Sequence, residues 1–170
     1  PKDTLALTRT AQDAGTPLRL IETVVDVNDA RKRAMAGKVI AACGGDVKGK
    51  TIGVFGLTFK PNTDDMRDAP SLDILPALQA AGAKIRAFDP AGTLEAEKHF
   101  SDVDYVSGPY MAVEDADALV IITEWNEFRA LDLKRICTSL RSPVMVDLRN
   151  IYSADEAKAA GLEYFSIGRP

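Results

Sequence analysis

Two cationic side chains, Lys60 and Arg67, lie in a long polar loop between an apolar stretch and a helix-like stretch that starts near Ser71. Lysine supplies a compact positive charge, and arginine supplies a planar fork that matches phosphate oxygens. The start of a helix adds backbone N–H donors and a favourable dipole for an anion. The loop is therefore a candidate phosphate-binding site.

The same loop also carries the aspartates Asp64, Asp65 and Asp68. Exposed carboxylates would pair with Lys60 and Arg67 in a solvated loop that binds nothing, and composition alone favours that interpretation. A further cation, Arg149, lies at the end of the apolar stretch 143–150. If both apolar stretches are parallel strands, Lys60 and Arg149 lie at the same edge of a sheet and form a phosphate clamp.

The glycines before this loop do not follow the dinucleotide-binding fingerprint. In "KTIGVFGL" (50–57), Gly53 and Gly56 are present, but Phe59-Lys60-Pro61 stands where a third glycine belongs. The loop is also too long for the tight turn of a standard NAD cradle. Asp89, at the end of the next apolar stretch, fits either a ribose contact or an Asp-Pro turn.

From about residue 46 onward, stretches typical of strands alternate with helical stretches. Strands are predicted at 50–57, 83–90, 102–108, 117–124, 143–150 and 162–169. Helices are predicted at 71–82, with Ser71 as the N-cap, and at 92–100, 110–116, 128–140 and 153–161. This alternation predicts an α/β domain over 46–170, with a doubly wound, mostly parallel, Rossmann-like sheet.

Residues 1–45 are predicted to form a helical segment. A first helix, with Thr4 as a possible cap, ends at Gly15-Thr16-Pro17, and a longer helix runs from about 18 to 42. The long helix carries apolar residues on more than one face. It therefore packs against a neighbouring domain, a second subunit or its own domain, and the sequence leaves these alternatives open.

The composition argues against several classes of protein. Hydrophobic residues make up 46% of the chain, yet no apolar run approaches the ~20 residues that a membrane helix needs. The net charge of −4 argues against a nucleic-acid partner. Cys43, Cys137 and the single His99 stand apart in the sequence, which predicts no metal site and no cysteine nucleophile. Two separate cysteines and no visible secretory leader predict a reducing, cytoplasmic setting.

Several motifs together resemble one enzyme family. The stretches "GKTIGVFGLTFKPNTDDMRDAPS", "AGAKIRAFDP", "DADALVIITEWNEF" and "VMVDLRNIY" closely resemble the C-terminal domain of the UDP-glucose/GDP-mannose dehydrogenase family. "PKDTLAL" and "ETVVDVNDARK" resemble the segment that runs from that family's catalytic cysteine motif into its central dimer helix. The resemblance covers essentially the whole chain. It implies that 1–45 belong to a central dimerisation region, that 46–170 form a UDP-sugar-binding domain, and that the helix over 18–42 forms a homodimer.

The resemblance also implies a reaction and roles for particular residues. Enzymes of this family oxidise the C6 alcohol of a nucleotide sugar to a carboxylate with two NAD⁺, and a cysteine holds the intermediate as a thiohemiacetal and then a thioester. Phe59, Lys60 and Arg149 would bind the UDP-sugar. Lys2 and Arg67 would contact NAD. Asp3 would be catalytic and would help to activate the water that hydrolyses the thioester.

The cysteine of the family motif lies outside the sequence. The motif reads Gly-Gly-Ser-Cys-Phe-Pro-Lys-Asp, and the sequence starts at its proline, Pro1. We therefore expect the nucleophile and the domain that mainly binds NAD to lie upstream, and the 170 residues to be inactive on their own. UDP-glucose, oxidised to UDP-glucuronate, is the favoured substrate, with UDP-N-acetylmannosamine and GDP-mannose as alternatives. A non-catalytic module for nucleotide-sugar binding or dimerisation is the alternative from another class.

Overall fold

A six-stranded sheet forms the centre of the computed structural model, which describes residues 2–168 and only the backbone of Lys2. The strand order is β3-β2-β1-β4-β5-β6, and every neighbouring pair is parallel. The strands are β1 (Thr51–Phe55), β2 (Lys84–Phe88), β3 (Val103–Tyr105), β4 (Ala118–Ile121), β5 (Val144–Asp147) and β6 (Glu163–Ser166). The predicted fold class is confirmed. The order reverses between β1 and β4, the place where doubly wound sheets bind ligands beyond the carboxyl ends of their strands.

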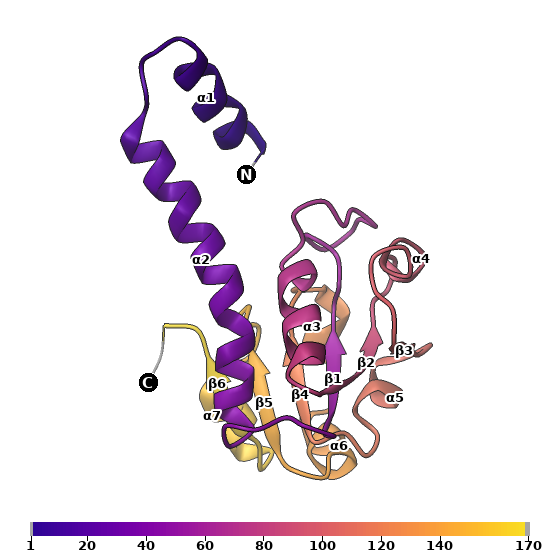
Figure 1. The fold of residues 1–170 in the computed structure, drawn as a ribbon. Helices are drawn as coiled ribbons and strands as arrows, with labels where there is room; N and C mark the ends of the chain where they lie inside the picture. The colour runs from indigo at the N-terminus through magenta and orange to yellow at the C-terminus, as the bar shows by residue number, and fades with distance from the viewer. Residues whose placement is uncertain (1, 169–170) are drawn as a thin grey trace.

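Helices cover both faces of this sheet (Figure 1). The first two helices of the chain are α1 (Lys2–Asp13) and α2 (Arg19–Ala42). The others are α3 (Ser71–Ala80), α4 (Thr93–Ala96), α5 (Pro109–Val113), the 3₁₀ helix η1 (Asn126–Ala130), α6 (Leu133–Ser139) and α7 (Ala154–Ala159). The helices α2, α3 and α4 contribute to the core on one face, and α5, α6 and α7 to the core on the other.

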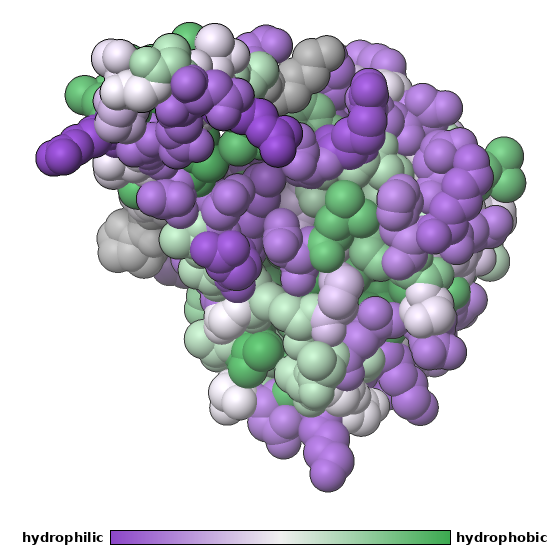
Figure 2. All heavy atoms as spheres, turned by 45° about the horizontal axis from the view of Figure 1, so that its top comes forward, coloured by the Kyte–Doolittle hydropathy of each residue, from purple (hydrophilic) through white to green (hydrophobic). Residues whose placement is uncertain are grey.

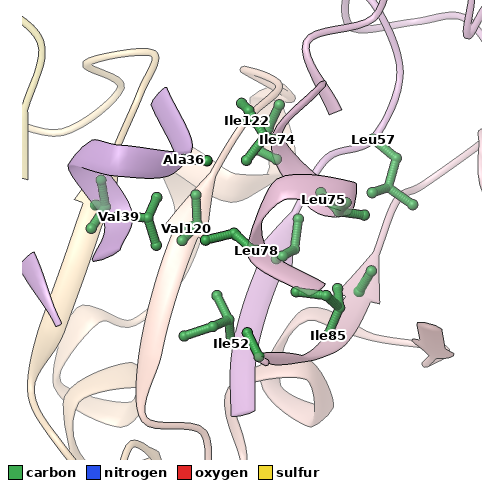
Figure 3. Close-up of a cluster of buried hydrophobic side chains, with 14 of the residues drawn as sticks. Ala36, Val39, Ile52, Leu57, Ile74, Leu75, Leu78, Ile85, Val120 and Ile122 are labelled. Carbon is green, nitrogen blue, oxygen red and sulfur yellow. The ribbon is translucent and has the colours of Figure 1, made fainter. Parts of the chain in front are cut away.

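The strands alternate between two hydrophobic cores. In β4, Val120 packs into the core beside α2 and α3, whereas Leu119 and Ile121 pack into the core beside α5 and α6. Figure 3 shows the first of these cores, where Val39 of α2 and Leu78 of α3 meet the strands. Because the central strands β1, β4 and β5 are buried on both faces, their sequences are almost continuously apolar, and this pattern made them predictable.

The helix α2 continues well beyond the sheet. Its C-terminal half reaches the core through Ala36 and Val39, whose side chains are buried. Its N-terminal half forms a hairpin with α1, and the hairpin projects past the carboxyl ends of the strands (Figure 1). The chain turns between the two helices at Gly15, whose φ is +67°. The hairpin thus forms one wall beside the loops that carry the predicted site.

The predicted single helix over 128–140 is wrong, because two short helices, η1 and α6, replace it. Asp132 lies between them as the N-cap of α6, and its side chain accepts the backbone N–H groups of Lys134 and Arg135. An N-cap aspartate fixes the start of a helix because it satisfies donors that have no partner inside the helix. The helix therefore starts anew after Asp132.

Two of the predicted helix caps are also wrong. Helix α1 already includes Thr4, whose carbonyl accepts the hydroxyl hydrogen of Thr8 inside the helix. Ser71 is the first residue of α3 and its N-cap is Pro70. The Ser71 hydroxyl instead donates to the carbonyl of Leu57, which ties the two ends of the long loop together.

Candidate functional site

A pocket of about 450 Å³ lies between the α1–α2 hairpin and the loops beyond the carboxyl ends of the sheet. Figure 2 views this end of the molecule, where apolar atoms show among polar ones. The hairpin contributes Thr4, Leu5, Val25, Asn28, Asp29, Arg31, Lys32 and Met35. The sheet domain contributes Phe59, Asp68, Pro70, Ile74, Ile122, Leu148, Arg149 and Ile167. The lining combines apolar side chains with three cations (Arg31, Lys32 and Arg149) and two carboxylates (Asp29 and Asp68), so it offers an organic ligand both apolar and charged contacts.

Arg149 is the predicted cation that lines this pocket. Its backbone N–H donates to Oδ1 of buried Asp147 at the end of β5 (3.0 Å). Its guanidinium donates from Nε to Oε2 of Glu124 (2.5 Å) and from Nη2 to Oε1 (2.7 Å). Burial raises the pKa of Glu124, but the hydrogen bonds and charge of Arg149 outweigh burial and leave this pKa below its ordinary value.

Phe59 and Lys60 are neighbours in sequence but differ in position. The Phe59 backbone N–H donates to the carbonyl of Asp65 across the loop (2.9 Å), and its ring lines the pocket and packs against the core. Lys60 is exposed and lies outside the pocket lining. Its carbonyl accepts the hydroxyl hydrogen of Thr58 (3.1 Å), so its backbone is tied to the loop while its ammonium group reaches solvent.

Arg67 forms an ion pair with Asp65 inside the long loop. Its side chain is 84% exposed and donates to Asp65 from Nε (2.9 Å) and Nη2 (2.7 Å). Hydrogen bonds from the side chain and backbone of Arg67 lower the pKa of Asp65 to about 2. Any stability from this pair is complete above the ordinary aspartate pKa and is lost as the pH falls toward 2. The ion pairing that the sequence left open is thus present at Arg67.

A second, shallower hollow of about 370 Å³ contains Arg67. It is lined by Thr63, Asp64, Asp65, Met66, Arg67, Glu95 and His99. Arg67 therefore faces a different part of the surface from Arg149. The structure brings Phe59 and Arg149 to one pocket and places Arg67 at another, as two separate ligands or two parts of an extended ligand would require.

The predicted residues of the N-terminal helix lie beside the first pocket. Asp3 is exposed in the first turn of α1, and its successors Thr4 and Leu5 line the pocket. The side chain of Lys2, predicted to contact NAD, lies outside the described residues. The roles of Asp3 and Lys2 stay predictions.

Asp89 has a structural role that explains its position at the end of β2. It is 4% exposed, and its Oδ2 accepts the backbone N–H groups of Leu57 (2.7 Å) and Thr58 (3.2 Å) and the indole N–H of Trp125 (3.2 Å). Its Oδ1 accepts the N–H of Gly92 (2.7 Å). The turn interpretation therefore fits Asp89, because groups of the chain itself occupy both oxygens.

The two cysteines are free thiols and are not among the residues that line the pocket. Burial raises the pKa of the Cys43 thiol, which disfavours the reactive thiolate. Within the part of the chain that the structure describes, no cluster of three or more His, Cys, Asp or Glu side chains is arranged to hold a metal. Over the same residues, no helix combines the length and apolarity needed to cross a membrane.

Comparison with known proteins identifies the family. Residues 53–154, more than half of the chain, match the model of the UDP-glucose/GDP-mannose dehydrogenase family, UDP binding domain. The chain belongs to this family. The matched residues include β1 from Gly53 onward, the long loop with Phe59, Lys60 and Arg67, and Arg149 after β5. The family resemblance drawn from the sequence is thus confirmed, while the role of each site residue stays a prediction.

Two relatives in sequence and one in structure carry the name of UDP-glucose dehydrogenase. The chain is 59% identical over its whole length to UDP-glucose 6-dehydrogenase of Rhizobium meliloti, of which it covers 39%. It is 46% identical to UDP-glucose 6-dehydrogenase TuaD of Bacillus subtilis over its whole length, which is 37% of that protein. The solved UDP-glucose dehydrogenase of Pyrobaculum islandicum superposes with a TM-score of 0.78 at 30% identity, over 97% of this chain and 36% of that one. The chain thus spans well under half the length of these relatives.

Sequence reasoning missed Glu124 as a partner of Arg149. The two residues lie 25 positions apart, and their contact depends on the pairing of β4 with β5. The signal in the sequence was that each follows a buried strand, which placed both at one sheet edge. Which charged residues at that edge meet was visible only in the structure.

Proposed function

We propose that this chain forms the UDP-sugar-binding part of a cytoplasmic, NAD-dependent UDP-glucose 6-dehydrogenase, which oxidises UDP-glucose to UDP-glucuronate. The observation that carries the proposal is the pocket that unites Phe59 and Arg149, within a chain 59% identical to a UDP-glucose 6-dehydrogenase. Phe59 offers an aromatic ring and Arg149 a guanidinium, which suit a base or sugar ring and phosphate or hydroxyl oxygens respectively. Lys60, the residue after Phe59 in the same loop, adds a positive charge on a flexible side chain.

Over the residues that the structure describes, the loop after β1 is not shaped as a dinucleotide cradle. The position of a Cβ on Gly53 lies 2.6 Å from the carbonyl oxygen of Ala112, so this glycine serves the packing of α5 on β1. The loop after β1 is held by Asp89 and closes on the protein instead of opening toward a pyrophosphate. NAD, when bound, accepts the hydride. It would therefore be held mainly by parts of the enzyme outside these residues. In this chain, exposed Arg67 has the chemistry to contact a cofactor phosphate.

Binding of UDP-glucose tests the substrate site. We expect the chain to bind UDP and UDP-glucose, and to bind GDP-mannose more weakly, in an NMR titration that detects millimolar dissociation constants. Replacing Arg149 or Lys60 by alanine should raise the Kd for UDP about tenfold or more, because a charge-assisted hydrogen bond contributes roughly 1.5–3 kcal/mol.

Lys84→Ala is the matched control, since Lys84 is an exposed lysine at the start of β2, on the opposite edge of the sheet. Its Kd should stay within about twofold of the wild-type value, as for a surface change away from the site. An unchanged Kd in Arg149→Ala would remove Arg149 from the site. Tighter binding of GDP-mannose than of UDP-glucose would favour the other substrate class of the family.

We further propose that the α1–α2 hairpin forms a homodimer. Large apolar side chains are exposed along it, including Leu20 (76%), Val27 (60%) and Leu7 (49%). Light scattering should give the mass of a dimer, and Leu20→Glu should shift it toward the monomer, because a charge in an apolar interface is costly. Leu94→Glu on α4 is the control, since Leu94 is 75% exposed but lies away from the hairpin. A monomeric wild type would contradict this proposal.

A further inference from the structure

Glu124 contacts Arg149 without lining the pocket. Arg149 itself lines the pocket. Their side chains are 37% and 28% exposed, so the pair is partly shielded from water. The carboxylate takes one edge of the guanidinium, formed by Nε and Nη2. Among the described side chains, no group is bonded to Nη1, and Nη2 retains a second hydrogen.

The backbones that carry the two residues are fixed before the side chains meet. Strands β4 and β5 are neighbours with Ile121 opposite Asp147, so the residues that follow them emerge at the same level. Next to Glu124, the hydroxyl of Thr123 donates to the carbonyl of Thr58 (2.6 Å). Next to Arg149, Asp147 accepts the Arg149 N–H. The Glu124–Arg149 contact therefore restricts the long, flexible side chain of Arg149, the part of this arrangement that the backbone does not fix.

We propose that Glu124 is a positioning residue that holds the Nε–Nη2 edge of Arg149 and so presents the Nη1–Nη2 edge to the oxygens of a nucleoside diphosphate in the pocket. This inference rests on the proposed function, because it assumes that Arg149 contacts the ligand. A free arginine side chain samples many rotamers and loses that freedom when it binds. Glu124 removes part of this freedom in advance, and the two edges of the guanidinium allow Arg149 to hold both partners at once.

Glu124 also exerts an opposing effect, because its negative charge repels an anionic ligand. At a solvent-facing rim this repulsion acts through a high dielectric and is screened by salt. Screening of the repulsion between Glu124 and the ligand is strongest where the pocket opens to solvent, and the ligand would lie there. We therefore expect ordering of Arg149 to outweigh repulsion, so that removal of the carboxylate weakens binding. The sign of the change in Kd separates the two effects.

The experiment measures UDP binding by NMR at physiological salt in the 170-residue chain and in five variants. Glu124→Gln should raise the Kd about two- to tenfold, the range for an immobilised long side chain. Glu124→Asp keeps the charge but shortens the reach, and it should fall between Glu124→Gln and the wild type. Arg149→Ala should weaken binding, and adding Glu124→Gln to Arg149→Ala should cause no further weakening. Glu127→Gln, which removes the charge of an exposed nearby glutamate, should leave the Kd within about twofold.

A spectroscopic readout reports the positioning itself. The Arg149 Nε–H signal, identified by its loss in Arg149→Ala, should be slow to exchange in the wild type and fast in Glu124→Gln. Equal or tighter UDP binding by a folded Glu124→Gln would overturn the inference and leave the proposed function intact. A wild type that does not bind UDP would overturn the proposed function, and an Nε–H signal unchanged by Glu124→Gln would then overturn the positioning role as well. If Glu124→Gln does not fold, wild-type affinity in Glu124→Asp overturns the inference.

Discussion

Replacing Asp89 by alanine is expected to lower the free energy of unfolding by about 4 kcal/mol or more, because several buried donors lose their acceptor at once. The N–H groups of Leu57, Thr58 and Gly92 and the indole N–H of Trp125 all point at this carboxylate. A buried donor without a partner costs roughly 1–3 kcal/mol, and the cavity left by the side chain adds to that cost. Since domains are stable by about 5–15 kcal/mol, Asp89→Ala should lie near the limit of folding.

Two further variants make this measurement specific. Asp89→Asn keeps the shape and one acceptor oxygen but turns an NH₂ group toward donors, so we expect about half the loss seen in Asp89→Ala. Asp26→Ala, an exposed aspartate on α2, should change stability by no more than about 0.5 kcal/mol. Urea unfolding followed by far-UV circular dichroism is the suitable probe, because the single Trp125 contacts Asp89 and its fluorescence would change for local reasons. A loss in Asp89→Ala no larger than in Asp26→Ala would contradict the role given to this carboxylate.

Asp89 links the stability of the fold to the candidate site. It fixes Leu57 and Thr58 at the start of the loop that leads to Phe59, and it does so from the end of the neighbouring strand, β2. Through Trp125 it also reaches the segment after β4 that carries Glu124. Three of the loops at the carboxyl edge of the sheet therefore share one buried acceptor, which holds the pocket in shape without contacting a ligand.

The sequence predicted the central strands β1, β4 and β5 well because burial on both faces leaves an almost continuous apolar run. It failed where a polar side chain decides a boundary. Asp132 restarts a helix that the apolar pattern alone would continue, and Ser71 donates to Leu57 in place of capping its own helix. These choices depend on which backbone groups lack partners in three dimensions, and a linear pattern does not contain that information.

The sequence predicted which types of residue form the site, but not which charged side chains form ion pairs with one another. Lys60 and Arg67 share a loop, yet the structure places Arg67 with Asp65 at a hollow separate from the pocket of Arg149. The Glu124–Arg149 contact requires the register of β4 and β5. Cations near a strand end are equally common in solvated loops, so the residue types alone did not identify a ligand. The expected ligands came from the family resemblance. The structure then distinguished Arg149, which lines the pocket beside the hairpin, from Lys60 and Arg67, whose side chains are exposed.

The two glycines that first suggested a nucleotide fingerprint provide the last prediction. A Cβ on Gly56 would lie 2.5 Å from Cβ and 2.8 Å from N of Thr123, and its φ is +82°. A Cβ on Gly53 would lie 2.6 Å from the Ala112 carbonyl oxygen, without a positive φ. Both glycines therefore allow close packing of the chain on itself, from β1 against α5 and against the segment after β4.

Four alanine variants separate steric overlap from backbone strain. Gly44→Ala has a φ of +87° but open space and should cost about 1–2 kcal/mol, the penalty of the left-handed region. Gly37→Ala has neither problem and should stabilise α2 by about 0.5–1 kcal/mol. Gly53→Ala should cost about 1–3 kcal/mol from overlap alone, and Gly56→Ala, with both penalties against backbone atoms, about 3–5 kcal/mol. Urea unfolding of all four gives the order, and a Gly56→Ala no less stable than Gly44→Ala would show that the Thr123 segment moves aside. The expected order would establish that these glycines are required by the fold itself, and would leave the charged residues of the following loops as the part of this edge that is available to a ligand.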